Sequence, residues 1–268
     1  MTEDLAKEVE KWLKKSGYPL EMEVAQTLKN AGFSVVQSEY FEDNDTDKWR
    51  ETDVVAYHEN PSNGACKPIF ATVIECKGDP SKPWVLFSAA DNYPTSLSVS
   101  RRATSNDGSR VLHALSVQEQ IKDLTMFTLP ARPAYGITCA FLDTDKKASQ
   151  PDIAYRALQS VCKATNGLIK RLEDIEHQKL LPFAWPVIVI NAPLFESYLN
   201  DDGKLEVSEL SSGTLVWRNP LVNRHSLIQI VTKKQLDQYA NDLFKDASFF
   251  LTAVSETFDL LFLNSQDS

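Results

Sequence analysis

The stretch 50–77 constrains the fold of this chain more than any other part of its sequence. It holds two apolar segments rich in β-branched residues, 50–57 and 69–77, on either side of the polar turn sequence Asn-Pro-Ser-Asn-Gly at 60–64. Short apolar runs that flank turn residues are typical of a β-hairpin. We therefore expect two paired strands here.

Ionisable side chains gather at one end of this hairpin. Side chains alternate between the two faces of a strand, so Glu75 and Lys77 share one face and Cys76 lies on the other. If the hairpin pairs so that Asp53 meets the face of Glu75, two carboxylates and one ammonium converge. Two carboxylates repel each other in an apolar setting, and a hard cation between their oxygens relieves that repulsion. The pattern predicts a Mg²⁺ site, also suited to Mn²⁺, beside a lysine.

The helix expected before the hairpin turns one acidic residue toward the core. Pro19 in its first turn and Gly32 after a basic last turn mark its two ends. Glu21 lies at the edge of the apolar stripe of this helix, whereas Glu23 lies among polar residues. An unpaired carboxylate facing a core is costly, and a metal ion or its bound water would satisfy it. Glu21 is therefore a candidate site residue.

An Asp at the end of one strand, followed by Glu-X-Lys at the end of the next, resembles the motif of the PD-(D/E)XK nuclease superfamily. The matching residues are Asp53, Glu75 and Lys77; the Pro that often precedes the Asp is absent, and Thr52 stands there. The resemblance covers the first third of the chain, where helix, strand and the two motif-bearing strands follow in that order. It implies a restriction endonuclease-like α/β fold, a mixed central sheet flanked by helices.

The resemblance also implies a Mg²⁺-dependent phosphodiesterase. Asp53, Glu75 and the backbone carbonyl of Cys76 would hold the metal ion, and Glu21 would orient it directly or through water. Lys77 would position the attacking water and neutralise charge on the phosphate. DNA is expected as substrate rather than RNA, and a part in prokaryotic defence or restriction is an expectation at the level of the family.

Two other functions stay open. A nuclease-fold protein without catalysis could act as a binding or assembly module through its C-terminal helix, and the acidic net charge favours that alternative. A glycosidase with two carboxylates would need no lysine and would be indifferent to EDTA. Intact Glu75 and Lys77 favour the nuclease.

Composition excludes some classes of protein. The 268 residues carry a formal net charge of −9, which argues against a protein that coats nucleic acid through bulk positive charge, although a local basic groove would still serve an enzyme. The four cysteines form no C-x-x-C pair, so neither a zinc site nor a disulfide framework is indicated. The acidic N-terminus and the lack of a long apolar run predict a cytoplasmic protein without membrane contact.

Substrate contacts are expected near the hairpin and in one loop. Lys82 and Trp84 could meet a phosphate and a base, although Trp84 is better explained as a core residue. Arg101 and Arg102 belong to an expected long loop, 92–108, and form the nearest basic patch.

The whole chain 1–268 is expected to form one domain. Its catalytic core would span about 16–90, and a helical element about 233–263 would carry an apolar stripe that serves either the core or a homodimer interface. The acidic run 39–48 is expected to be a solvated connection, and the helix 2–15 to pack on the core. Further strands are expected at 33–37, 134–142, 185–191, 214–218 and 226–231, and further helices at 109–124 and 149–177.

Overall fold

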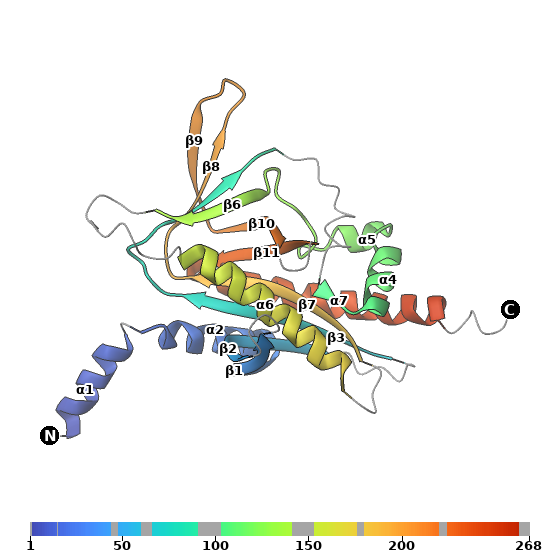
Figure 1. Ribbon diagram of the computed structural model, residues 1–268, viewed down its shortest axis with the longest axis horizontal. Coiled ribbons are helices and arrows are strands. Elements are labelled where there is room, and N and C mark those ends of the chain that lie inside the picture. Colours follow the sequence, from blue (N-terminus) through green and yellow to red (C-terminus); the bar gives the residue numbers. More distant parts are fainter. Residues whose placement is uncertain are drawn as a thin grey trace.

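The computed structural model describes residues 2–14, 16–43, 48–59, 66–90, 103–140, 153–175, 180–219 and 224–262. One large mixed β-sheet forms the centre of the protein, and helices pack on both of its faces (Figure 1). The expected class, α/β with a mixed central sheet flanked by helices, is therefore confirmed.

The strands come from most of the chain. They are β1 Ser34–Asp43, β2 Lys48–Glu59, β3 Lys67–Lys77, β4 Trp84–Ser88, β5 Ala103–Thr104, β6 Ala134–Cys139, β7 Leu180–Ile190, β8 Leu194–Leu199, β9 Leu205–Leu210, β10 Ser212–Asn219 and β11 Arg224–Thr232. Their order across the sheet is β1-β2-β3-β7-β11-β10-β6-β4-β8-β9, with β5 paired to β7. Because β3, β7 and β11 run parallel, their carboxyl ends meet at one edge.

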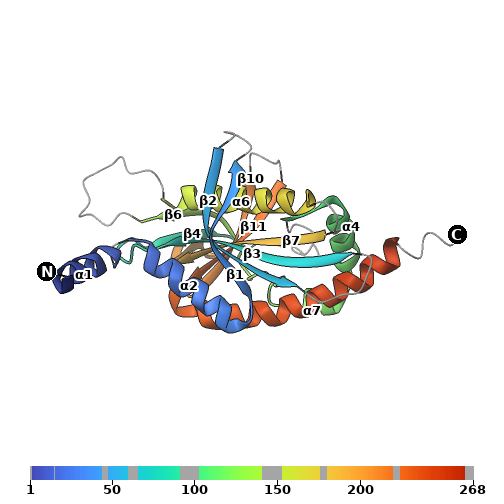
Figure 2. The same ribbon diagram turned by 90° about the horizontal axis from the view of Figure 1, so that it is seen from below.

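All helices except the first lie on the two sides of this sheet. The helices are α1 Thr2–Leu13, α2 Tyr18–Ala31, α4 Asn106–Leu115, α5 Glu119–Lys122, α6 Ile153–Glu173 and α7 Leu236–Phe262, the last preceded by the 3-10 turn η1 Lys233–Gln235. The sheet packs on α6 with one face and on α2 and α7 with the other, as Figure 2 shows from below. Two hydrophobic cores result, one on each face.

The predicted hairpin is present and connects the two cores. β2 and β3 pair antiparallel, with Val54 opposite Ile74 and Val55 opposite Val73. Alternation sends Val54 and Ile74 into the core under α2 and α7, and Val55 and Val73 into the core under α6. β3 is buried on both faces because helices cover both sides of the sheet, and the apolar strand β7 runs parallel beside it.

Helix α2 forms as its end signals predict. Its first turn contains Pro19, and Leu20, Val24 and Leu28 are buried on the sheet. Gly32 ends the helix with φ +114°, a left-handed conformation that glycine adopts without strain. A Cβ at this position would also lie 2.7 Å from the ring of Phe244 on α7, so glycine is required for space as well.

Helix α1 does not pack on the core, and this expectation is wrong. Leu5, Val9 and Trp12 are 61%, 47% and 61% exposed, and α1 extends away from the sheet in Figure 1. Its sequence is amphipathic, but no described element covers its apolar side. An apolar stripe indicates that a helix can bury one face, but it does not indicate which surface covers that face.

Three expected boundaries change. The described part of the expected loop 92–108 forms β5 and the start of α4, and the expected helix 109–124 is split, because α4 ends before Ser116. The acidic run 39–48 is not simply a solvated connection, since β1 extends to Asp43 and buries it. Strands β8 and β9, which are joined by the turn at 200–204, were not predicted. The turn 60–64 lies outside the described residues.

The apolar stripe of α7 is buried within the chain. Its residues pack on α2, α4 and the sheet, so the stripe serves the core of the same molecule. A homodimer through this helix stays a prediction. No helix among the described residues is long and apolar enough to cross a membrane.

Candidate active site

The hairpin brings three of the predicted residues together. Continuing the register of β2 and β3 by one residue places Asp53 opposite Glu75. The Oδ2 atom of Asp53 accepts a hydrogen bond of 2.6 Å from the backbone N–H of Cys76. The Nζ atom of Lys77 forms an ion pair with Glu75 and donates to the carbonyl oxygen of Cys76 at 3.2 Å. Two carboxylates and one ammonium therefore meet at the end of the hairpin.

Burial changes the acidity of these groups. Burial and the neighbouring charge of Glu75 raise the pKa of Asp53 to about 7, although the Cys76 N–H and Lys77 oppose this shift. Burial also works against the charge of Lys77, but the ion pair with Glu75 outweighs it and raises the pKa of Lys77. Burial and the charge of Glu75 thus favour the protonated form of Asp53. A divalent cation would favour its ionised form.

Glu21 reaches the same region from α2. Burial and the negative charges of Glu51 and Glu75 raise the pKa of Glu21, and Lys77 lowers it. Its carboxylate is therefore close enough to interact electrostatically with the charged groups of the hairpin site. Among the residues that the structure describes, however, no three His, Cys, Asp or Glu side chains form a group that could hold a metal ion.

The donor set at the hairpin fits Mg²⁺ better than it fits a metal that needs a full protein cage. Asp53, Glu75 and the carbonyl of Cys76 offer three oxygen donors. Mg²⁺ usually keeps several waters and binds through one or two carboxylates together with substrate phosphates. The Cys76 side chain does not contribute, because it lies in the opposite core and burial raises the pKa of its thiol well above the ordinary value.

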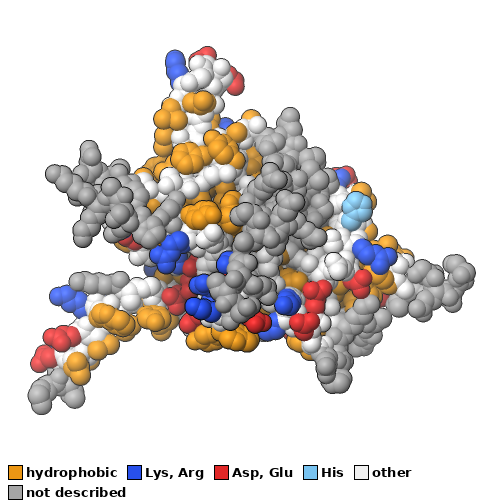
Figure 3. All heavy atoms as spheres, viewed as in Figure 1, with side chains coloured by type: hydrophobic (Ala, Val, Ile, Leu, Met, Phe, Trp, Pro, Cys, Tyr) orange, Lys and Arg blue, Asp and Glu red, His pale blue; other side chains and the backbone are white. Residues whose placement is uncertain are grey.

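A pocket of about 350 Å³ opens beside this group. Besides Glu75 and Lys77, its walls are Arg50 on β2 and five residues of α6: Ile153, Arg156, Gln159, Ser160 and Lys163. Four of the eight lining side chains are cationic and one is acidic, although the whole chain has a net charge of −9. Figure 3 shows Lys and Arg side chains, with Asp and Glu side chains among them, on the face that α6 covers. This is a local basic groove of the kind expected for an enzyme that acts on a polyanion.

Two of these cations are held in place by Asp43. Its carboxylate, 2% exposed, accepts from Arg50 Nε at 2.5 Å and from Lys163 Nζ at 3.1 Å. A buried carboxylate is tolerated only when it is paired, so this residue fixes both side chains in the wall. Asp43 is therefore a positioning residue of the pocket.

The structure contradicts the expected substrate contact of Trp84, gives Lys82 another partner, and does not describe the two arginines. Trp84 is 3% exposed and packs in the core under α6, so its stacking on a base is wrong and the core alternative is correct. Lys82 forms an ion pair of 3.3 Å with Asp79 and does not line the pocket. Arg101 and Arg102 lie outside the described residues.

Sequence reasoning missed the cationic wall. Arg156 and Lys163 lie about two turns apart and so share one face of α6, a signal that the sequence contains. What the sequence does not give is the partner of that face. Arg50 was read only as the start of the hairpin strand.

His58 has a packing role. Its Nε2 atom lies 2.9 Å from the hydroxyl of Ser248 on α7, and its ring contacts Phe33 and Phe244. Burial disfavours the charged imidazolium and therefore lowers the pKa of His58.

Comparison with protein-family models, with curated proteins and with solved structures gives no match to this chain. The fold, the residues at the hairpin end and the pocket beside them are therefore the features that bear on function.

Proposed function

We propose that this protein is a metal-dependent nuclease that hydrolyses phosphodiester bonds, in DNA rather than in RNA. One observation carries the proposal: Asp53, Glu75 and Lys77 meet at the end of one hairpin and adjoin a pocket walled by cations. Clustered carboxylates suit a hard cation, and Lys and Arg side chains suit the phosphate of the substrate. A part in prokaryotic defence remains an expectation from the resemblance alone.

The residues divide the chemistry between them. Asp53, Glu75 and the carbonyl of Cys76 would hold Mg²⁺ or Mn²⁺, with Glu21 acting through water. The bound ion would supply positive charge that makes a water more acidic and offsets charge on the leaving oxygen. Lys77 would donate to a phosphate oxygen or orient the attacking water.

The pocket wall orients the substrate. Arg50, Arg156 and Lys163 would bind the non-bridging phosphate oxygens and hold the phosphorus in line with the attacking water. Because Asp43 already fixes two of these three side chains, few side chains of the wall have to be ordered when the substrate reacts. The water oxygen bonds to phosphorus and gives up a proton to the solvent, the bond to the leaving sugar oxygen breaks, and that oxygen takes up a proton from the solvent.

The test is cleavage of plasmid DNA, linear DNA and RNA with Mg²⁺, with Mn²⁺ and with EDTA. Wild type is compared with Glu75→Gln and Lys77→Ala, and with Lys204→Ala, an exposed lysine in the turn between β8 and β9, as control. We expect both site variants to lose activity by about 100-fold or more and the control to keep it. Wild type that cuts no nucleic acid with either metal would contradict the proposal.

The alternative is a nuclease-fold binding or assembly module without catalysis. It is favoured by the ion pair that already neutralises Glu75 and by the lack of a three-residue metal group among the described side chains. Such a module would bind nucleic acid equally well in EDTA and in Mg²⁺, and Lys77→Ala would weaken that binding without any loss of cleavage to measure.

A further inference from the structure

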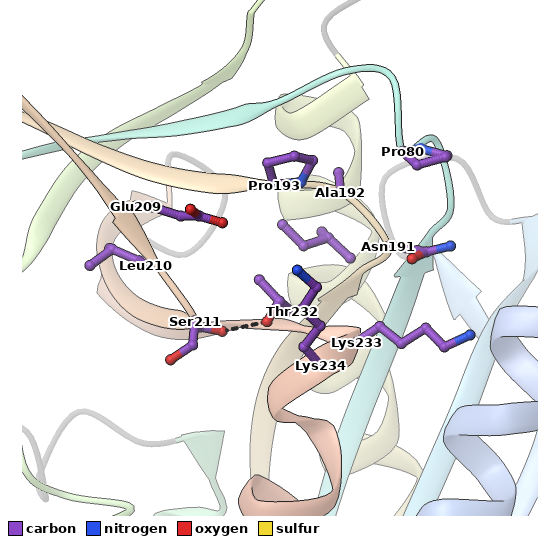
Figure 4. A pocket seen from close by; sticks show the side chains of 11 residues that line it. Pro80, Asn191, Ala192, Pro193, Glu209, Leu210, Ser211, Thr232, Lys233 and Lys234 are labelled. Atoms are coloured by element: carbon purple, nitrogen blue, oxygen red, sulfur yellow. Dashed lines mark hydrogen bonds between the residues drawn. The ribbon is translucent and has the colours of Figure 1, made fainter.

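A second cavity, of about 580 Å³, lies beyond the carboxyl ends of the parallel strands β7 and β11 (Figure 4). Open α/β sheets bind their ligands outside the carboxyl ends of parallel strands. The cavity is lined by Pro80, Ile190, Asn191, Ala192, Pro193, Glu209, Leu210, Ser211, Thr232, Lys233 and Lys234.

The cavity shares an edge of the sheet with the candidate active site. The backbone N–H of Asn191, a lining residue, donates to the carbonyl of Lys77 at 2.9 Å. Pro80, another lining residue, follows closely after Lys77 in the chain. A polymer that lies over the candidate active site can therefore extend along this edge to the cavity.

The two lysines of the cavity differ in their partners. Lys233 forms an ion pair with Glu23 of α2, and in Figure 4 its side chain extends away from Ala192 and Pro193. Lys234 is exposed, and none of the described residues forms an ion pair with it.

The start of η1, which carries these lysines, is fixed in place. Thr232 donates twice to the carbonyl of Ser211, from its backbone N–H at 3.0 Å and from its hydroxyl at 2.9 Å. Lys234 is therefore attached to a rigid backbone. Asn191 and Ser211 add neutral polar groups to the lining, and Glu209 is its acidic member.

We infer that this cavity binds a phosphate group of the substrate strand, next to the phosphate that is cut. Lys234 supplies the ion pair to the phosphate oxygens. Contacts of this type set the position of a nucleic acid without reading its sequence. The identity of the ligand rests on the proposed function, but its binding does not require cleavage.

The experiment measures binding of a labelled DNA duplex by fluorescence anisotropy in EDTA, so that no strand is cut. Affinity is measured between about 50 and 200 mM KCl for wild type, Lys234→Ala, Lys234→Arg and the control Lys204→Ala. The plot of log affinity against log salt has a negative slope, and each lost phosphate contact reduces the magnitude of that slope by about 0.9. We expect this decrease for Lys234→Ala, and the wild-type slope for Lys234→Arg and Lys204→Ala.

Equal slopes for Lys234→Ala and wild type would overturn the inference. So would a thermal shift with inorganic phosphate that depends on Lys234 while the DNA slope does not, because the cavity would then serve a free phosphate ligand. A slope that depends on Lys234 in a protein that cuts nothing would support the inference and refute only the proposed hydrolysis.

Discussion

Replacement of Asp53 by Asn should stabilise the metal-free protein at high pH, although Asp53 belongs to the candidate active site. The pKa of this carboxyl is about 7, against 3.8 for an ordinary aspartate, because of burial and the charge of Glu75. One pKa unit corresponds to about 1.4 kcal/mol. Ionising Asp53 in the folded protein therefore costs about 4 kcal/mol relative to ionising it in the unfolded chain.

The direction of this pH dependence follows from the number of protons that the folded protein and the unfolded chain bind. Between pH 3.8 and about 7 the unfolded chain has released this proton and the folded protein still holds it. Stability from this group is thus fully present below pH 3.8 and is lost as the pH rises through about 7. Asn has the shape of the protonated acid and keeps an acceptor for the Cys76 N–H, but it cannot ionise. We expect Asp53→Asn to match wild type near pH 4 and to exceed it by up to about 4 kcal/mol above pH 7.

Urea unfolding in EDTA at several pH values measures this difference. Asp79→Asn is the matched control, since hydrogen bonding from Ser81 lowers the pKa of Asp79 and its replacement should give no gain at high pH. Parallel pH profiles of wild type and Asp53→Asn would refute the reasoning. Added Mg²⁺ should stabilise wild type, by about 2.7 kcal/mol at 100 times its dissociation constant, and should leave Asp53→Asn nearly unchanged.

Three further substitutions test the scaffold and the pocket. Asp43→Asn should lower the free energy of unfolding in urea by about 2 kcal/mol, because it leaves two cations without their buried partner. The control Glu42→Gln, at the neighbouring exposed position, should lower it little. Equal losses of stability in the two variants would contradict the role of Asp43. Gly32→Ala should cost about 2 kcal/mol in thermal unfolding, and more than Gly203→Ala, since both have positive φ but a Cβ meets an aromatic ring only at Gly32. Arg156→Ala, at an exposed wall position, should weaken DNA binding while the melting temperature stays unchanged, and a lower melting temperature would assign it to folding instead.

The parts predicted from sequence are those with local causes. Helix α2 is marked by Pro19 and Gly32 within its own sequence, and the hairpin follows from alternation and turn residues over a short stretch. The meeting of Glu75 and Lys77 requires only that side chains alternate along a strand.

The cationic wall has a distant cause. Asp43 and Lys163 are 120 residues apart in the chain, and their ion pair depends on how α6 crosses the sheet. Composition alone made Asp43 look like part of a solvated acidic run. Arg50 and Lys163 pair with it in its buried position, and the contact with Lys163 cannot be read from the sequence around Asp43.

The ion pair between Lys77 and Glu75 gives the chain a counterion of its own. Where a metal ion is the only positive charge in a cluster of acids, the chain cannot fold until the ion arrives, and a chelator unfolds it. Here the ammonium of Lys77 already supplies a positive charge beside Glu75. If the site binds a metal ion as proposed, we therefore expect the protein to stay folded when a chelator removes that ion.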